Sequence, residues 1–179
     1  ACLVGSEMCI RDSNEANVIA SINTYEPELV NSASHGSYDG LWLYYDGTYA
    51  SAITPISLTN KPHLWYASAC LAGGYDWDGG DCFGEALMKN SDGGALAFVG
   101  ATRVTWYYVG YPEHYWGLNG AQDYLFWWEF LEWNDHNPGS ALYGSKLMYI
   151  FGWCYDLQDE AERKNLFAYM LLGDPALYS

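Results

Sequence analysis

The sequence predicts an α/β fold in which a mostly parallel sheet is packed between helices. Two short apolar runs, residues 64–69 and 95–101, are bounded by Pro or Gly, a pattern typical of fully buried strands. Segments with helical spacing of apolar residues alternate with these runs, which favours βαβ units. Half of the 179 residues are hydrophobic, so the chain has enough apolar surface to bury a core.

The remaining elements follow from periodicity and from Pro, Gly and capping residues. A third strand is expected over 28–34, whereas 38–63 is expected to be a long connection with a helical turn at 56–60. Loops are expected over 71–81 and over the aromatic stretch 102–119. Helices are expected at 14–24, at 82–89 with Asp81 as N-cap, at 121–133 with Asn119 as cap, at 138–152 with Asn137 as cap, and at 158–170.

The charge of the chain excludes several classes of partner. The chain has 7 Lys and Arg and 22 Asp and Glu residues, which gives a formal net charge of −15. Nucleic-acid binding and docking on anionic lipid both depend on basic residues, so neither is expected. No apolar run reaches the roughly 20 residues that span a bilayer. The sequence does not set the oligomeric state.

A histidine and a cysteine follow two successive predicted strands. His35 comes after the strand at 28–34, and Cys70 comes after the strand at 64–69. Ligands of open α/β sheets bind outside the carboxyl ends of the strands, and a neighbouring histidine can convert a thiol to a thiolate. Gly36 would let the chain turn sharply, and the N–H groups of Gly36 and Cys70 could form an oxyanion hole. The alternative is a small buried cysteine and an ordinary His-Gly turn.

Five segments carry a resemblance to a known family. The segments NSASHGS and ASACLAGG resemble the His-Gly and Ala-Cys blocks of caspase-like (clan CD) cysteine peptidases. FGEALMKNSDGGALAFVGATRVTW, GSALYGSKLMYI and YMLLGDPALY resemble, in the same order, later segments of the gingipain family. The resemblance covers residues 14–179 and implies a three-layer αβα, caspase-like architecture.

The resemblance also implies roles for individual residues. His35 would be the general base and acid, Cys70 the nucleophile, and Gly36 and Cys70 the donors of the oxyanion hole. Trp106 resembles a tryptophan that lines the primary specificity pocket, although it could also be an ordinary aromatic residue packed over a strand end. The resemblance implies a protein or peptide substrate, no required cofactor, and a location outside a prokaryotic cell or on its surface. The family's early strands and the acidic groups that select a basic side chain are expected upstream of this chain, so substrate preference does not carry over.

The first thirteen residues, ACLVGSEMCIRDS, resemble a translated sequencing-adapter read. We therefore expect residues 1–13 to lie outside the fold and residues 14–179 to be the C-terminal part of a gingipain-like peptidase domain that is truncated at its N-terminus. Without this segment the cysteines are Cys70, Cys82 and Cys154, whose spacing indicates neither a disulfide framework nor a zinc site.

An acidic loop follows Cys70. Asp76, Asp78 and Asp81 resemble the start of a calcium loop, but the spacing does not complete the EF-hand pattern. A solvated acidic turn, a calcium site and recognition of a cationic substrate residue all stay open. Cys82, at a predicted helix start, is expected to be a packed structural cysteine.

The predicted function is that of a cysteine endopeptidase that works through a Cys-His dyad and a thioester. The alternatives are a non-catalytic binding or scaffold domain of the same fold in a secreted surface protein, and a serine hydrolase of another α/β type. The serine alternative has no GxSxG motif to support it.

Overall fold

The structure of the whole chain is a computed structural model. It describes residues 2–3, 8–9, 15–45, 48–53, 58–108, 117–133, 136–153 and 157–177. The strands are β1 (Cys2–Leu3), β2 (Met8–Cys9), β3 (Leu29–Ala33), β4 (His35–Gly36), β5 (Leu41–Tyr45), β6 (Thr48–Ile53), β7 (Leu64–Ser68), β8 (Ala97–Ala101) and β9 (Tyr169–Gly173). The helices are α1 (Glu15–Tyr25), α2 (Phe83–Lys89), α3 (Leu118–Trp128), α4 (Pro138–Met148) and α5 (Glu160–Ala168).

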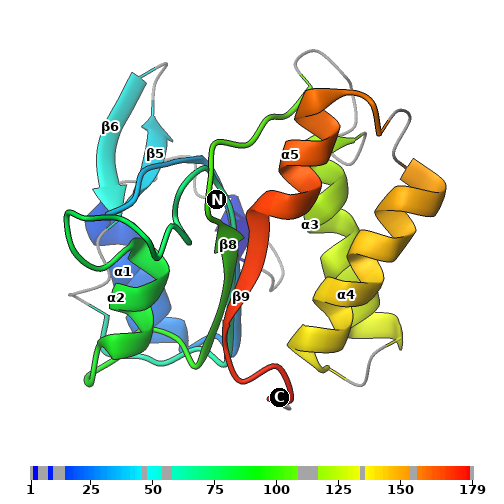
Figure 1. Cartoon of the computed structure of the whole chain (residues 1–179). Helices are drawn as coiled ribbons and strands as arrows, with labels where there is room; N and C mark the ends of the chain where they lie inside the picture. Colours follow the sequence, from blue (N-terminus) through cyan, green and yellow to red (C-terminus); the bar gives the residue numbers. More distant parts are fainter. Residues whose placement is uncertain are drawn as a thin grey trace.

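The main sheet has the strand order β3-β7-β8-β9. The first three strands are parallel, and β9 pairs antiparallel with β8. Helices α1 and α2 lie on one side of this sheet, and α3, α4 and α5 lie on the other (Figure 1). The predicted three-layer α/β fold is therefore confirmed.

Alternating side chains of the central strands build a core on each face of the sheet. Trp65 of β7 and Phe98 of β8 pack with buried residues of α1 and α2. Their neighbours Tyr66 and Val99 pack on the opposite face, with Phe126 of α3 among others. Every residue of β7 and β8 is buried, as expected for strands that helices cover on both sides.

The structure corrects the prediction for residues 38–63. Instead of one long connection, β4, β5 and β6 form a separate antiparallel sheet. The part of the predicted turn at 56–60 that is described, residues 58–60, is not helical. The sequence signal that was missed is an Asp-Gly pair between two aromatic-rich runs, which is typical of a β-hairpin.

Helix ends differ from the prediction in two places. Cys82 is the N-cap of α2 instead of Asp81, and its main-chain N–H donates to the Glu85 carboxylate at 3.0 Å. Gly117 is the N-cap of α3 instead of Asn119. Asn137 caps α4 as predicted, because its side chain accepts from the Ser140 N–H.

Three further features complete the fold. Helices α3 and α4 each continue into a π-helical turn, Glu129–Trp133 and Tyr149–Trp153. Strand β9 was not predicted, because it follows α5 directly, without a Gly or Pro between them. Strands β1 and β2 pair with each other, and the expectation that residues 1–13 lie outside the fold stays a prediction. Within the described ranges, no helix has the length and apolar character needed to cross a membrane.

Candidate active site

The parallel pairing of β3 with β7 sets the position of both predicted dyad residues. Ala33 and Ser68, the last residues of the two strands, are partners in the register. The strands stay together beyond these ends, because the Ser34 N–H donates to the Ser68 carbonyl at 3.3 Å. His35 and Cys70 each follow two residues after the paired ends, so both lie at the carboxyl edge of the sheet.

Gly36 lies directly against the main chain of Cys70. A Cβ atom at position 36 would stand 2.3 Å from the Cys70 carbonyl oxygen and 2.9 Å from the Ala69 Cβ. Contacts this short cannot be relieved by rotating a side chain, because a main-chain atom stands in the way. The close approach of residues 36 and 70 requires glycine at position 36.

His35 is exposed and begins β4, where it pairs with Trp42 of β5. Its imidazole ring lies edge-on to the Tyr107 ring, with centroids 6.5 Å apart. Tyr107 belongs to the loop that leaves β8. The histidine therefore stands between the small antiparallel sheet and this loop, at an open edge of the main sheet.

The thiol of Cys70 is half-buried and contacts Thr105, a residue that the sequence analysis did not single out. The Thr105 main-chain N–H donates to the Cys70 sulfur at 3.4 Å. In the thiol form, the S–H group donates to the Thr105 carbonyl, also at 3.4 Å. No local sequence motif predicts this contact, because the two residues are 35 positions apart in the chain.

Leu71 follows Cys70 in the left-handed region, with φ of 62°. This conformation is uncommon for a residue with a side chain, and such strained positions cluster at active sites. Its main-chain N–H donates to the Arg103 carbonyl at 3.3 Å, and its carbonyl accepts from Gly74 at 2.9 Å. The chain thus turns sharply just after Cys70, and the loop after β8 holds the turn.

The main chain of Trp106 is held in place by hydrogen bonds to helices α3 and α5. Asn165 of α5 donates to its carbonyl at 2.8 Å and accepts from its N–H at 2.9 Å. The Asn119 N–H of α3 donates to the same carbonyl at 3.0 Å. The Lys164 ammonium lies 5.4 Å from the centroid of the indole ring, a cation–π contact. Trp106 is 37% exposed, and its role in specificity stays a prediction.

The sequence profile of Peptidase family C25 matches residues 6–178. This chain belongs to that family. Because family C25 is the gingipain family, the resemblance seen in the sequence segments is confirmed.

A solved structure described as "Structure of Protease" has a similar fold, with a TM-score of 0.65 and 20% sequence identity. The alignment covers 93% of this chain but 38% of that one, so the present C25 chain spans well under half the length of this structural neighbour. At this identity the likeness concerns the fold alone. No curated protein sequence matches the chain.

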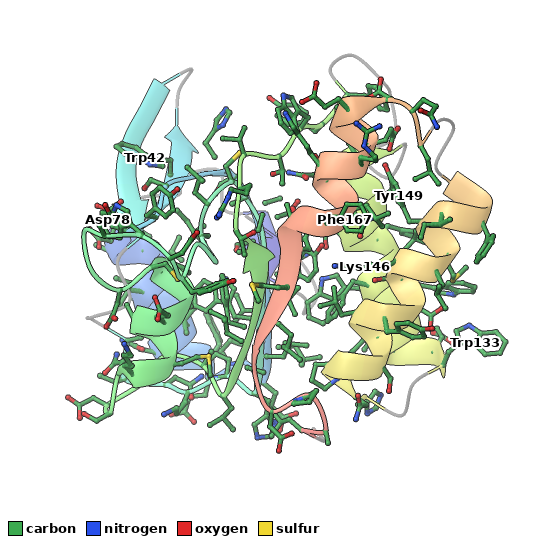
Figure 2. The ribbon with its side chains drawn as sticks, viewed as in Figure 1. Trp42, Asp78, Trp133, Lys146, Tyr149 and Phe167 are labelled. Carbon is green, nitrogen blue, oxygen red and sulfur yellow. The ribbon has the colours of Figure 1, made fainter. Side chains whose placement is uncertain are left out.

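The acidic loop of this C25 chain lies next to basic side chains. Arg103 makes two hydrogen bonds to the Asp76 carboxylate, at 2.9 and 2.6 Å, and these lower the pKa of Asp76. Lys89 pairs with Asp81 at 2.5 Å, while Asp78 is exposed (Figure 2). Within the described part of the chain, no group of three or more His, Cys, Asp or Glu side chains is arranged to hold a metal ion. Calcium binding by this loop stays a prediction.

Cys82 is the second free cysteine of the described residues and is completely buried at the start of α2. Desolvation raises the pKa of its thiol, so the unreactive protonated form is favoured. Cys154 lies outside the described residues.

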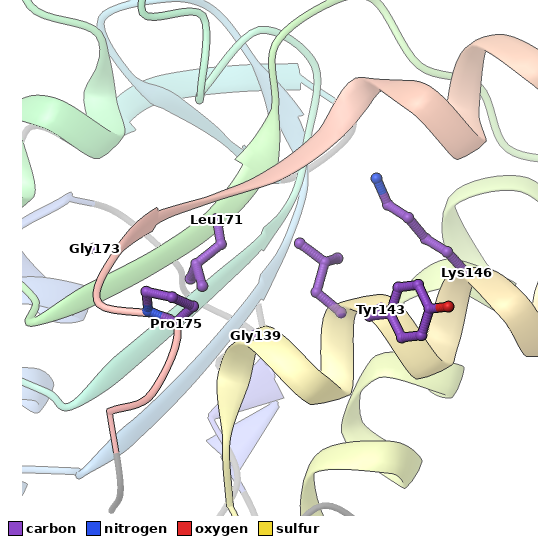
Figure 3. A pocket seen from close by; sticks show the side chains of 7 residues that line it. Gly139, Tyr143, Lys146, Leu171, Gly173 and Pro175 are labelled. Carbon is purple, nitrogen blue, oxygen red and sulfur yellow. The ribbon is translucent and has the colours of Figure 1, made fainter.

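An open groove of about 360 Å³ runs between α4 and β9 (Figure 3). Gly173 and Pro175 line one end of the groove. Gly173 pairs with Ala97, the first residue of β8, whereas Cys70 lies at the other edge of the sheet. The Lys146 ammonium at this groove already donates to the Tyr169 carbonyl, at 2.6 Å. The residues that line the groove do not include His35, Cys70, Thr105 or Trp106, so the groove is not part of the candidate active site.

Proposed function

We propose that this chain forms the catalytic part of a cysteine endopeptidase, with Cys70 as nucleophile and His35 as general base and acid. The observation that carries the proposal is the half-buried Cys70 at the carboxyl end of a central strand, with the Gly36 main chain packed against it, in a member of a peptidase family. The left-handed Leu71 supports it, since a sharp turn after the cysteine leaves the sulfur at the surface of the sheet edge.

In the proposed reaction, His35 takes the thiol proton and the Cys70 sulfur attacks the carbonyl carbon of a peptide bond. The C–N bond breaks as His35 donates that proton to the leaving amine, which leaves a thioester on Cys70. A water molecule, deprotonated by His35, then attacks the thioester carbon. The C–S bond breaks, the acid product leaves, and the sulfur regains its proton.

The negative charge that develops on the carbonyl oxygen needs donors at the same edge. The main-chain N–H groups of Gly36 and Cys70 are our candidates, because the two residues are in contact and such donors act without reorganisation. We also propose Trp106 as one wall of the site for the substrate side chain. It follows Thr105, which touches the sulfur, and two helices hold its main chain.

Alkylation with iodoacetamide tests the nucleophile directly. We expect Cys70 to react at least about tenfold faster than Cys82 near neutral pH, because Cys82 is buried with a raised thiol pKa. His35→Ala should slow the reaction at Cys70 and leave that at Cys82 unchanged. Mass spectrometry of peptides from each cysteine gives both rates in one sample.

Hydrolysis of fluorescently labelled, unfolded casein tests the activity. We expect Cys70→Ala and His35→Ala to abolish it and Cys82→Ala to preserve it. Equal, slow alkylation of both cysteines together with no casein hydrolysis would overturn the proposal and favour a non-catalytic module of the same fold.

A further inference from the structure

A chain of buried hydrogen bonds leads from α5, through α3, to the sulfur of Cys70. Asn165 is fully buried and Asn119 and Thr105 are nearly so. Asn165 Nδ2 donates to Asn119 Oδ1 at 2.7 Å, and Asn119 Nδ2 donates to Thr105 Oγ1 at 2.9 Å. The Thr105 Oγ1 atom lies 3.7 Å from the Cys70 sulfur.

The hydrogen bond between the Trp106 N–H and Asn165 sets the direction of all the others in this series. The main-chain N–H of Trp106 can only donate, so the atom of Asn165 that meets it, at 2.9 Å, must be the carbonyl oxygen. The amide nitrogen of Asn165 therefore faces Asn119, which must present its own oxygen in return. The amide nitrogen of Asn119 is then left for Thr105, whose hydroxyl oxygen must act as acceptor.

This order leaves the hydroxyl proton of Thr105 unused by the two asparagines. Since Asn119 occupies a lone pair of Oγ1, the hydroxyl proton is available for another acceptor, and the Cys70 sulfur is within reach. Successive hydrogen bonds of one direction polarise each other, which strengthens the last donor in the series. The main-chain N–H of Thr105 donates to the sulfur, and its hydroxyl is placed to be a second donor from the same residue.

We propose that Thr105 is a catalytic residue whose hydroxyl group donates a hydrogen bond to the Cys70 sulfur and so stabilises the thiolate. Asn119 and Asn165 are positioning residues for this hydroxyl. This proposal rests on the proposed function of Cys70. Hydrogen bonds to the charged form of a group favour that form, and a thiolate accepts more strongly than a thiol. The Thr105 carbonyl holds the S–H proton in the resting state, and the two donors take over when the proton leaves.

The other titratable groups near the sulfur come from three elements. His35 of β4 lies at the same edge with its ring against Tyr107 of the following loop. Tyr169 of β9 is buried with its phenol toward Ser68 and Thr105, and desolvation raises its pKa, so it stays neutral across the range of the test. A change of hydroxyl at position 105 therefore leaves the charges around the sulfur unaltered.

Two substitutions at position 105 isolate the hydroxyl. Thr105→Val keeps the shape and the main-chain N–H but removes the hydroxyl donor, whereas Thr105→Ser keeps it. We expect Thr105→Val to slow the alkylation of Cys70 by iodoacetamide about 3- to 10-fold near neutral pH, and to move the half-maximal rate about 0.5–1 pH unit higher. Thr105→Ser should stay within about twofold of wild type.

Thr102→Val is the matched control, because Thr102 stands in the same loop as Thr105 and its hydroxyl donates to the Ala168 carbonyl of α5, at 3.1 Å. It should leave the pH profile of Cys70 unchanged. Circular dichroism and the protection of Cys82 from alkylation check that each variant is folded.

Asn119→Ala tests the positioning role. It should slow the alkylation of Cys70 by no more than Thr105→Val does. The double variant of Asn119→Ala and Thr105→Val should be no slower than Thr105→Val alone, since both substitutions act through the Thr105 hydroxyl. An additive loss would overturn the assignment of Asn119.

The proposal is overturned if Thr105→Val keeps the wild-type rate and pH profile, or if Thr105→Ser falls as far as Thr105→Val. Failure of the proposed function is a different result: wild-type Cys70 would react no faster than Cys82 and casein would stay intact. The comparison between the two Thr105 variants still measures the effect of the hydroxyl in that case.

Discussion

Cys70 and Cys82 stand twelve positions apart, yet they lie in opposite surroundings. Cys82 is fully buried at the first turn of α2, and desolvation raises the pKa of its thiol. Cys70 is half-buried at the end of β7, with donors from Thr105 and the main chain of Gly36 beside it. A cysteine at a helix N-terminus is often activated by the helix dipole, but here burial raises the pKa of the Cys82 thiol, so we expect the strand-end cysteine to be the more reactive one. For these two cysteines we therefore expect burial and hydrogen-bond partners, rather than the type of element, to set the difference in reactivity.

The largest expected effect comes from filling the space at Gly36. We expect Gly36→Ala to lower the free energy of unfolding by about 1–3 kcal/mol and to slow the alkylation of Cys70, because the new methyl group meets the Cys70 carbonyl. Gly152→Ala is the control, since a Cβ atom there would meet no heavy atom within 4 Å beyond its chain neighbours and the backbone of its own helix. Urea denaturation measures the first effect, and equal stability of the two variants would contradict the close packing at Gly36.

Serine substitutions test the difference in burial between the two cysteines. Cys82→Ser places a hydroxyl in a buried site and should lower the free energy of unfolding by about 1–2 kcal/mol. Cys70→Ser should cost less than about 0.5 kcal/mol, because the hydroxyl takes over the contacts with the Thr105 main chain. Urea denaturation compares the two, and a larger loss at position 70 would reverse the comparison.

Asp123 of α3 tests whether desolvation raises the pKa of a carboxyl group as it raises that of the Cys82 thiol. Desolvation raises the pKa of Asp123 to about 7, although Asn31 donates to it at 2.9 Å. The folded protein therefore keeps a proton between about pH 4 and 7 that the unfolded chain releases, and stability falls as the pH rises through this range.

We accordingly expect Asp123→Asn to raise the free energy of unfolding at pH 8 by about 1–2 kcal/mol, and to leave it unchanged at pH 4. This change in the free energy of unfolding is smaller than the full pKa shift of Asp123 would give, because Asp123 is only half-buried. Denaturation curves at both pH values check this, and equal gains at pH 4 and pH 8 would point to a cause other than the charge.

The smallest effect is expected at the ion pair beside Cys70. Arg103 and Asp76 are both exposed, so Arg103→Gln should leave the thermal midpoint nearly unchanged. Main-chain hydrogen bonds from Leu71 to Arg103 and from Gly73 to Ala101 already tie this loop to the end of β8 and the residues that follow it. A large loss of Cys70 alkylation in this variant would show that the ion pair, rather than the main chain, positions the loop.

The sequence alone predicted the elements that repeat a strong pattern. The strands around Trp65 and Phe98 were identified because runs buried on both faces are apolar throughout, and α4 because Asn137 and Pro138 mark its start. The hairpin of β5 and β6 has a turn signal, the Asp-Gly pair between its strands, but the prediction treated this aromatic-rich segment as a connection. Strand β9 lacks a local boundary, because it follows α5 directly. The edge that carries His35 and Cys70 was predictable, since it depends only on the parallel order of two strands.

By itself, the sequence determined the α/β class, the family, and the pair of strand ends at which His35 and Cys70 stand. The tertiary structure alone decided what surrounds the sulfur. Thr105, Asn119 and Asn165 come from a loop and two helices far apart in the chain, and a hydrogen-bond series between them has no spacing that a linear pattern could reveal. The physical reason is that the register of strands follows from local alternation, whereas the direction of a hydrogen bond depends on which atoms meet in space.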